Sequence, residues 1–267
     1  MLGDTVSKLA AAGAERARFL ERNPAGFWIS AMMAGIYVGF GILLIFSLGS
    51  VMDPSVRPLA MGASFGLALI LVVFAGADLY TGLTMSMTLA LLERRVTVSG
   101  LCRVWATSWA GNLAGSLLLA ALFVAGGGGL ITTASSEFVY KAAAAKMNLD
   151  AFQLVCRAML CNWLVCLALW MAARITNEAA KMIAIAWCLF AFIASGYEHS
   201  VANMTLFGVA LLSPHPESVS WGGMLWNLVW VTLGNTISAV VFMAAAYWAA
   251  SKPDASAVAM PRAEPAE

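Results

Sequence analysis

The sequence predicts an all-α integral membrane protein with six transmembrane helices, on three observations. First, 61% of the 267 residues are hydrophobic, 11% are charged and the mean hydropathy is +0.84, whereas soluble domains carry roughly 25% charged residues. Second, six apolar runs are long enough to cross a bilayer, which takes roughly 20 helical residues. Third, the second and fifth runs are interrupted near their middles by polar residues. The runs cover residues 27–49, 58–93, 103–125, 153–173, 180–212 and 224–250.

The flanking segments divide the chain into three parts. Residues 1–26 space apolar side chains at helical intervals among charges, which predicts an amphipathic helix at the membrane interface or against a pore mouth. Its apolar face comprises Val6, Leu9, Ala10, Gly13, Ala17 and Leu20. Residues 27–250 form the six-span membrane domain. Residues 251–267 are poor in large apolar side chains, so we expect a disordered tail.

Basic residues lie unevenly in the connections between the runs. Eleven Lys and Arg residues fall on the side that holds both termini, against Arg57, Lys141 and Lys146 on the other, with Arg157 at the start of the fourth run. Lys and Arg favour the cytoplasmic side. We therefore expect both termini in the cytoplasm and a multi-pass protein of a bacterial inner membrane. The net charge of +1 gives no nucleic-acid surface, so the expected partner is lipid.

The two interruptions carry ionisable groups at membrane depth. The second run contains Asp78 and Thr81, and the fifth contains Glu198, His199 and Asn203. Such groups are costly inside a bilayer and normally face a cavity or one another, and irregular backbone at that depth lines protein or water. The interruptions therefore mark a pathway, with His199 as a pore residue. Asp78 and Glu198 either cap helix ends there or contact the permeating species.

Matching motifs indicate an internal repeat. Gly76-Ala-Asp78 corresponds to Gly196-Tyr-Glu198, and Gly111-Asn112 corresponds to Gly234-Asn235. The offsets are 120 and 123 residues. Because each copy has three spans, an odd number, the second copy must be inverted in the membrane relative to the first. This is a 3+3 inverted repeat, which places its transport site at mid-membrane. Half-helices that begin there favour a small monovalent anion, because a helix N-terminus carries partial positive charge.

The run from Gly196 to Met204, together with Asp78-Leu-Tyr-Thr-Gly82 and Gly234-Asn235, resembles the formate/nitrite transporter family over roughly residues 5–250. The resemblance implies an aquaporin-like protomer in a homopentamer with a separate pore in each subunit. It also implies nitrite as permeant, with formate or hydrosulfide as alternatives within the family. The Gly35-x-x-x-Gly39 and Gly111-x-x-x-Gly115 pairs predict close helix packing, and we expect subunits to associate through such faces.

The resemblance also assigns roles to single positions. His199 corresponds to the family's central pore histidine, and Thr81 to the threonine of the break in the second span. Lys146, in the connection 126–150, corresponds to a lysine near the periplasmic vestibule. Asn162 and Asn235 correspond to polar positions of the fourth and sixth spans. The family's hydrophobic constrictions correspond to Phe65, Leu69, Leu79 and Phe192, with Tyr80 where formate channels usually carry Phe. The Tyr80 hydroxyl either adjusts hydration in the constriction or is simply tolerated.

Two transport mechanisms use these same residues. In passive conduction, Lys146 concentrates the anion and Thr81 and neutral His199 donate hydrogen bonds. In proton-coupled transport, His199 supplies a proton so that the neutral acid crosses.

The sequence has no hydrolytic or nucleotide-binding motif, so neither an enzyme nor a cofactor is expected. A membrane redox subunit needs haem or metal ligands, and the only histidines are His199 and His215. A water or glycerol channel needs paired Asn-Pro-Ala motifs, which the sequence lacks.

Overall fold

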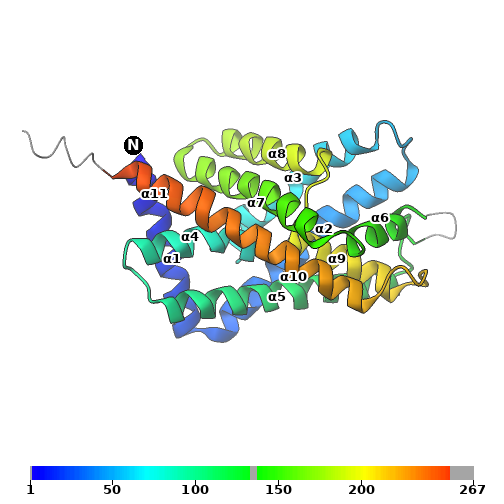
Figure 1. Cartoon of the computed structure of the whole chain (residues 1–267), viewed down its shortest axis with the longest axis horizontal. Coiled ribbons are helices and arrows are strands. Elements are labelled where there is room, and N and C mark those ends of the chain that lie inside the picture. Colours follow the sequence, from blue (N-terminus) through cyan, green and yellow to red (C-terminus); the bar gives the residue numbers. More distant parts are fainter. Residues whose placement is uncertain (1, 133–136, 253–267) are drawn as a thin grey trace, which may run out of the picture.

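The computed structural model describes residues 2–132 and 137–252, and these residues are organised as a bundle of helices (Figure 1). The all-helical prediction is confirmed. The predicted tail lies, from residue 253 onward, outside the described residues. In chain order the helices are α1 Leu2–Arg22, α2 Pro24–Val51, α3 Arg57–Ala75, α4 Tyr80–Leu92, α5 Val98–Ala125, α6 Phe138–Met147, α7 Ala151–Arg174, α8 Glu178–Ala194, α9 Ser200–Leu212, α10 Trp221–Ile237, η1 Ser238–Ala245 and α11 Ala246–Ser251.

Five helical segments of the described chain are long and apolar enough to cross a membrane. They are α2, α3, α5, α7 and the continuous run α10–η1–α11, which covers Trp221–Ser251. In Figure 1 this last run forms a single long rod that ends beside the N-terminus. Helix α8 is equally apolar but has 17 residues, and α4 and α9 have 13 residues each. These shorter helices belong to the second and fifth apolar runs.

Each of those two runs contains two helices separated by a short loop. Helix α3 ends at Ala75 and α4 begins at Tyr80, while α8 ends at Ala194 and α9 begins at Ser200. A glycine follows each first helix with positive φ, 73° at Gly76 and 70° at Gly196. Glycine adopts this left-handed conformation without a Cβ penalty. The chain can therefore leave the helix there and place polar backbone and side chains at the helix ends.

Small residues bring α2 and α5 into close contact within the subunit. A Cβ at Gly35 would overlap the carbonyl of Asn112, and a Cβ at Gly115 would overlap the carbonyl of Met32. These glycine pairs pack helices closely, as the sequence predicted. The expectation that these glycines join subunits is wrong, because the faces of both pairs already pack against other residues of the same chain.

Two elements were not expected from the sequence. Helix α6 lies in the connection 126–150, where the run of four alanines at 142–145 favours helix. The α10 helix passes into a π-helix, η1, at Ser238.

The amphipathic helix α1 packs along α4 with Val6, Ala10, Gly13, Ala17 and Leu20 buried. It therefore covers one end of the second run.

Candidate functional site

Thr81 and His199 meet at the centre of the structure. Thr81 Oγ1 lies 3.1 Å from His199 Nε2, and both residues are buried. The other ring nitrogen, Nδ1, accepts a hydrogen bond from the Ala202 backbone N–H at 3.1 Å. Because a backbone N–H can only donate, Nδ1 carries a lone pair and the ring proton lies on Nε2. Neutral His199 therefore donates to Thr81 Oγ1.

Asn112 of α5 holds the loop that presents Thr81. Its Nδ2 donates to the carbonyl of Asp78 at 3.0 Å and to that of Ala31 at 2.7 Å, and its Oδ1 accepts from the Tyr80 N–H at 2.9 Å. The Asp78 carbonyl lies in the loop and the Tyr80 N–H in the first turn of α4, so neither has a partner within a helix, and two of these bonds satisfy them. The loop geometry is thereby fixed by one side chain of a neighbouring helix.

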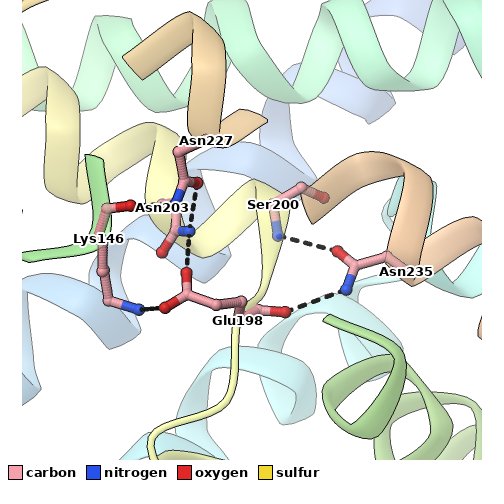
Figure 2. A network of polar contacts seen from close by, with 6 residues as sticks. All are labelled: Lys146, Glu198, Ser200, Asn203, Asn227 and Asn235. Atoms are coloured by element: carbon pink, nitrogen blue, oxygen red, sulfur yellow. Dashed lines mark hydrogen bonds and ion pairs between the residues drawn. The ribbon is translucent and has the colours of Figure 1, made fainter. Parts of the chain in front are cut away.

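Asn235 of α10 holds the loop that presents His199 in the same way (Figure 2). Its Nδ2 donates to the carbonyls of Glu198 and Ala158 at 3.0 and 2.8 Å, and its Oδ1 accepts from the Ser200 N–H at 3.0 Å. The contacts of Asn235 thus repeat those of Asn112, one half of the chain later. Asn162 of α7 links the two sides, since its Nδ2 donates to the carbonyls of Asn235 at 2.7 Å and Thr81 at 3.3 Å.

Three cavities follow one another through the Thr81–His199 region. The Arg16 cavity, about 340 Å³, is lined by residues that include Lys8, Arg16, Asp78, Leu69 and Leu79. The central cavity, about 10 Å³, is lined by residues that include Phe65, Leu69, Leu79, Val165, Phe192 and His199. The Lys146 cavity, about 110 Å³, is lined by residues that include Lys146, Phe192, Tyr197, His199 and Asn203.

Shared walls connect these cavities in series. Leu69 and Leu79 separate the Arg16 cavity from the central cavity, and Phe192 and His199 separate the central cavity from the Lys146 cavity. The ring of Phe192 stacks on that of His199 at 5.9 Å between centroids and meets Phe65 edge-on at 5.5 Å. The central cavity holds about one water-sized sphere. It is the narrow point between two wider cavities, each of which has at least one charged side chain in a mainly apolar lining.

The Lys146 cavity is bordered by a closed polar network (Figure 2). Lys146 Nζ donates to Glu198 Oε1 at 2.7 Å, and Asn203 Nδ2 donates to Glu198 Oε2 at 2.7 Å. Asn227 Oδ1 accepts from Asn203 at 2.9 Å, while its Nδ2 donates to the Lys146 carbonyl at 2.9 Å. Glu198 is therefore held by Lys146 and Asn203, and the expected capping of α9 by this carboxylate is wrong. His199 is the residue that caps α9.

Asp78 is paired in a corresponding way by a residue that the sequence reasoning missed. Arg16 Nε of α1 lies 3.0 Å from Asp78 Oδ1, and an Arg16 guanidinium nitrogen donates to the Gly76 carbonyl at 3.4 Å. The cap position of α4 belongs to Leu79, so Asp78 does not cap that helix. The sequence did contain a signal that could have found Arg16. A buried carboxylate needs a cationic partner, and the amphipathic helix carries several basic side chains.

The comparisons with known proteins agree with this arrangement. Residues 3–249 match the family described as Formate/nitrite transporter. The chain belongs to the formate/nitrite transporter family. It is 51% identical to the nitrite transporter NirC of Escherichia coli (strain K12), covering 94% of this chain and 93% of that protein. A solved FNT family ion channel has a TM-score of 0.91 at 51% identity, covering 94% of this chain and all of that one. A pentameric formate channel with formate bound has a TM-score of 0.70 at 26% identity, covering 84% and 96%.

In this formate/nitrite transporter family member, the residues expected from sequence fall into two groups, with Tyr80 as an exception. Those that line the cavities are Lys146, Asn203, His199, Phe65, Leu69, Leu79 and Phe192. Those that contact or brace the lining residues are Thr81, Asn162, Asn235 and Glu198. Tyr80 belongs to neither group. It is not among the described residues that line the three cavities, and its hydroxyl contacts Thr236 of α10 at 2.7 Å.

Proposed function

We propose that this protein is a membrane channel for nitrite, which crosses from the Arg16 cavity through the central cavity to the Lys146 cavity. The observation that carries the proposal is the series of three cavities that narrows at His199 and has cationic side chains at both ends, Lys8, Arg16 and Lys181 in the Arg16 cavity and Lys146 in the Lys146 cavity. The 51% identity to a nitrite transporter supports nitrite as the permeant. A constriction lined mainly by Phe and Leu side chains obstructs a hydrated ion, so the anion must exchange water for other donors there.

The proposed topology has six spans in an inverted 3+3 repeat, with α3–α4 and α8–α9 as the two broken spans. Its support is the equivalent bracing of the two loops by Asn112 and Asn235. Both termini lie in the cytoplasm, following the distribution of basic residues, so the Arg16 cavity opens to the cytoplasm and the Lys146 cavity to the periplasm of a bacterial inner membrane. The pentameric formate channel of the same fold supports a homopentamer with one pathway in each subunit.

Nitrite is stabilised at the constriction by donors and by helix dipoles. Helices α4 and α9 begin at Tyr80 and Ser200, so their positive ends meet beside His199. The N–H groups of Tyr80 and Ser200 already donate to Asn112 and Asn235. The dipoles therefore act through their field, while the Nε2–H of His199 can turn from Thr81 to the anion. Lys146 raises the local nitrite concentration at its mouth.

Proton coupling is a further version of this mechanism. An imidazolium form of His199 would give its proton to nitrite, nitrous acid would cross, and the ring would return to neutral. A second ring proton must sit on Nδ1, which faces the Ala202 N–H at 3.1 Å. Two donors cannot share that contact, so the coupled version requires this cap to open. The closed cap favours the version in which His199 stays neutral.

Flux measurements in proteoliposomes test the proposal. Purified protein is reconstituted, and uptake of nitrite, formate and hydrosulfide is compared at equal concentration and pH against protein-free liposomes. We expect nitrite to enter fastest. Formate is the second candidate, because the pentameric channel of the same fold holds formate. Uptake of formate or hydrosulfide with nitrite at the protein-free rate would overturn nitrite as the permeant.

A further inference from the structure

The Tyr80 side chain of α4 is tied to α10. Its hydroxyl lies 2.7 Å from Thr236 Oγ1, and the Thr236 hydroxyl donates to the Thr232 carbonyl at 2.8 Å. Because the Thr236 proton is used in that second bond, the Tyr80 hydroxyl is the donor in the first. Thr232 Oγ1 in turn accepts from Trp109 Nε1 of α5 at 3.0 Å. The Tyr80 hydroxyl is thereby tied to α10, and Trp109 ties α10 in turn to α5.

The two residues that flank Tyr80 both serve the pathway. Leu79 lines the Arg16 cavity and the central cavity, and Thr81 accepts the hydrogen bond of His199. The Tyr80 backbone N–H is held by Asn112 Oδ1. Any shift of Tyr80 must therefore move a constriction residue and the partner of the pore histidine together.

The other half of the chain has no equivalent tie among its described residues. Ser200 corresponds to Tyr80, and its N–H is held by Asn235 as that of Tyr80 is held by Asn112. Its Oγ is buried and lacks a hydrogen-bond partner in the described part of the chain. The tyrosine hydroxyl is thus an addition specific to the Leu79–Thr81 side of the pathway.

We propose that Tyr80 is a positioning residue that sets anion selectivity, because its hydroxyl bond to Thr236 holds Leu79 and Thr81 in place at the constriction. The inference rests on the proposed function, since selectivity presumes an anion pathway. Phenylalanine would fill the same space as the tyrosine ring but would leave this loop held through its backbone alone. A looser loop discriminates less between nitrite and a slightly larger anion, because fixed donors and fixed walls are what distinguish them.

The test compares Tyr80→Phe, Thr236→Val and the double variant with wild type. Tyr37→Phe is the matched control, a partly buried α2 tyrosine whose hydroxyl makes no hydrogen bond within the described residues. Two quantities are measured: the ratio of nitrite to formate flux in proteoliposomes, and hydrogen–deuterium exchange of the amides of 76–81. We expect each single variant to lower the flux ratio about two- to tenfold, the range set by one hydrogen bond, and to speed exchange.

The double variant should resemble the single ones, because both changes remove the same bond. An unchanged ratio in Tyr80→Phe, or effects that add in the double variant, would overturn the proposal. If wild-type protein carries formate but not nitrite, the proposed function fails, and the exchange measurement then decides the role of Tyr80 alone. Faster exchange at 76–81 supports the tie, and wild-type exchange overturns it whatever the permeant.

Discussion

At the scale of single residues, the state of His199 follows from what its two ring nitrogens contact. Nδ1 accepts from Ala202 N–H and thereby caps α9, and Nε2–H points to Thr81. One side chain thus has a structural role at one nitrogen and a donor role at the other. Substitutions that separate the two roles distinguish helix capping from transport.

The His199→Asn variant should keep the fold, conduct nitrite and leave proton movement as it is in wild type, because the favoured version of the mechanism uses neutral His199. Asn is a preferred N-cap, so its Oδ1 can accept from Ala202 N–H, whereas His199→Ala removes the cap at a cost of about 1 kcal/mol. Nitrite flux and internal pH are recorded together in liposomes. Loss of proton uptake with nitrite flux intact would show that the ring does carry the proton, against the neutral form that the capping contact favours.

Lys146 is more than a solvated cation, because its partner Glu198 is 1% exposed and Lys146 itself is 24% exposed. Lys146→Ala leaves a buried carboxylate without its cation. We expect the free energy of unfolding to fall by about 2–3 kcal/mol, between the values of about 1 kcal/mol for an exposed ion pair and about 3–5 kcal/mol for a buried one, seen as a lower melting temperature in detergent. Adding Glu198→Gln to Lys146→Ala should restore most of the lost stability, because it removes the unpaired buried charge.

The same variants separate stability from anion capture. With stability restored in the double variant, nitrite flux should still fall more at low ionic strength than at high, because salt screens the attraction of the partly exposed Lys146 ammonium for anions. The matched control is Lys141→Ala, whose ion pair with Glu137 lies on the surface of α6. Equal losses at both ionic strengths would assign Lys146 a structural role only.

At the scale of helices, the sequence predicted the elements that depend on local patterns and missed those that depend on partners. Apolar runs, the glycines at 76 and 196 and the polar positions 78, 112, 198 and 235 are local signals. Helix α6 was missed because its ten residues are too few for a membrane span, and its contacts with α9 and α10 exist only in the folded chain. Arg16 was missed because its role exists only once α1 packs on α4. The constriction role of Tyr80, the first residue of α4, stays a prediction, because its hydroxyl contacts Thr236 and it is not among the described residues that line the three cavities.

The packing of α1 on α4 depends on a single glycine. A Cβ at Gly13 would overlap the Ser86 carbonyl, whereas Gly3 in the same helix has open space around it. We expect Gly13→Val to displace α1, break the Arg16–Asp78 pair and speed tryptic cleavage within α1. Gly3→Val carries the same side chain and should cleave at the wild-type rate. Equal cleavage of the two variants would contradict this packing.

At the scale of the whole molecule, the two halves present equivalent ion pairs at opposite mouths. Helix α1, which precedes α2, supplies Arg16 to Asp78, and α6, which precedes α7, supplies Lys146 to Glu198. Each loop carboxylate is therefore neutralised by a cation from the helix that begins its half. The described residues of one chain line all three cavities, as the proposed pathway within each subunit requires.

A complete pathway in each subunit predicts how mixed oligomers conduct. Val165→Phe places a large ring in the central cavity, which Val165 lines, and should block its own subunit. Wild-type and blocked chains are co-expressed in known ratios, and native mass spectrometry checks that five 28.2 kDa chains assemble. With independent pores, nitrite flux should fall in proportion to the blocked fraction, to about half at equal mixing.

A single pathway on the five-fold axis, closed by any blocked subunit, would leave about 3% of the wild-type flux at equal mixing, because all five chains must then be wild type. A steep loss of that kind, or a stable monomer or trimer in the spectrum, would contradict a pentamer of separate pores.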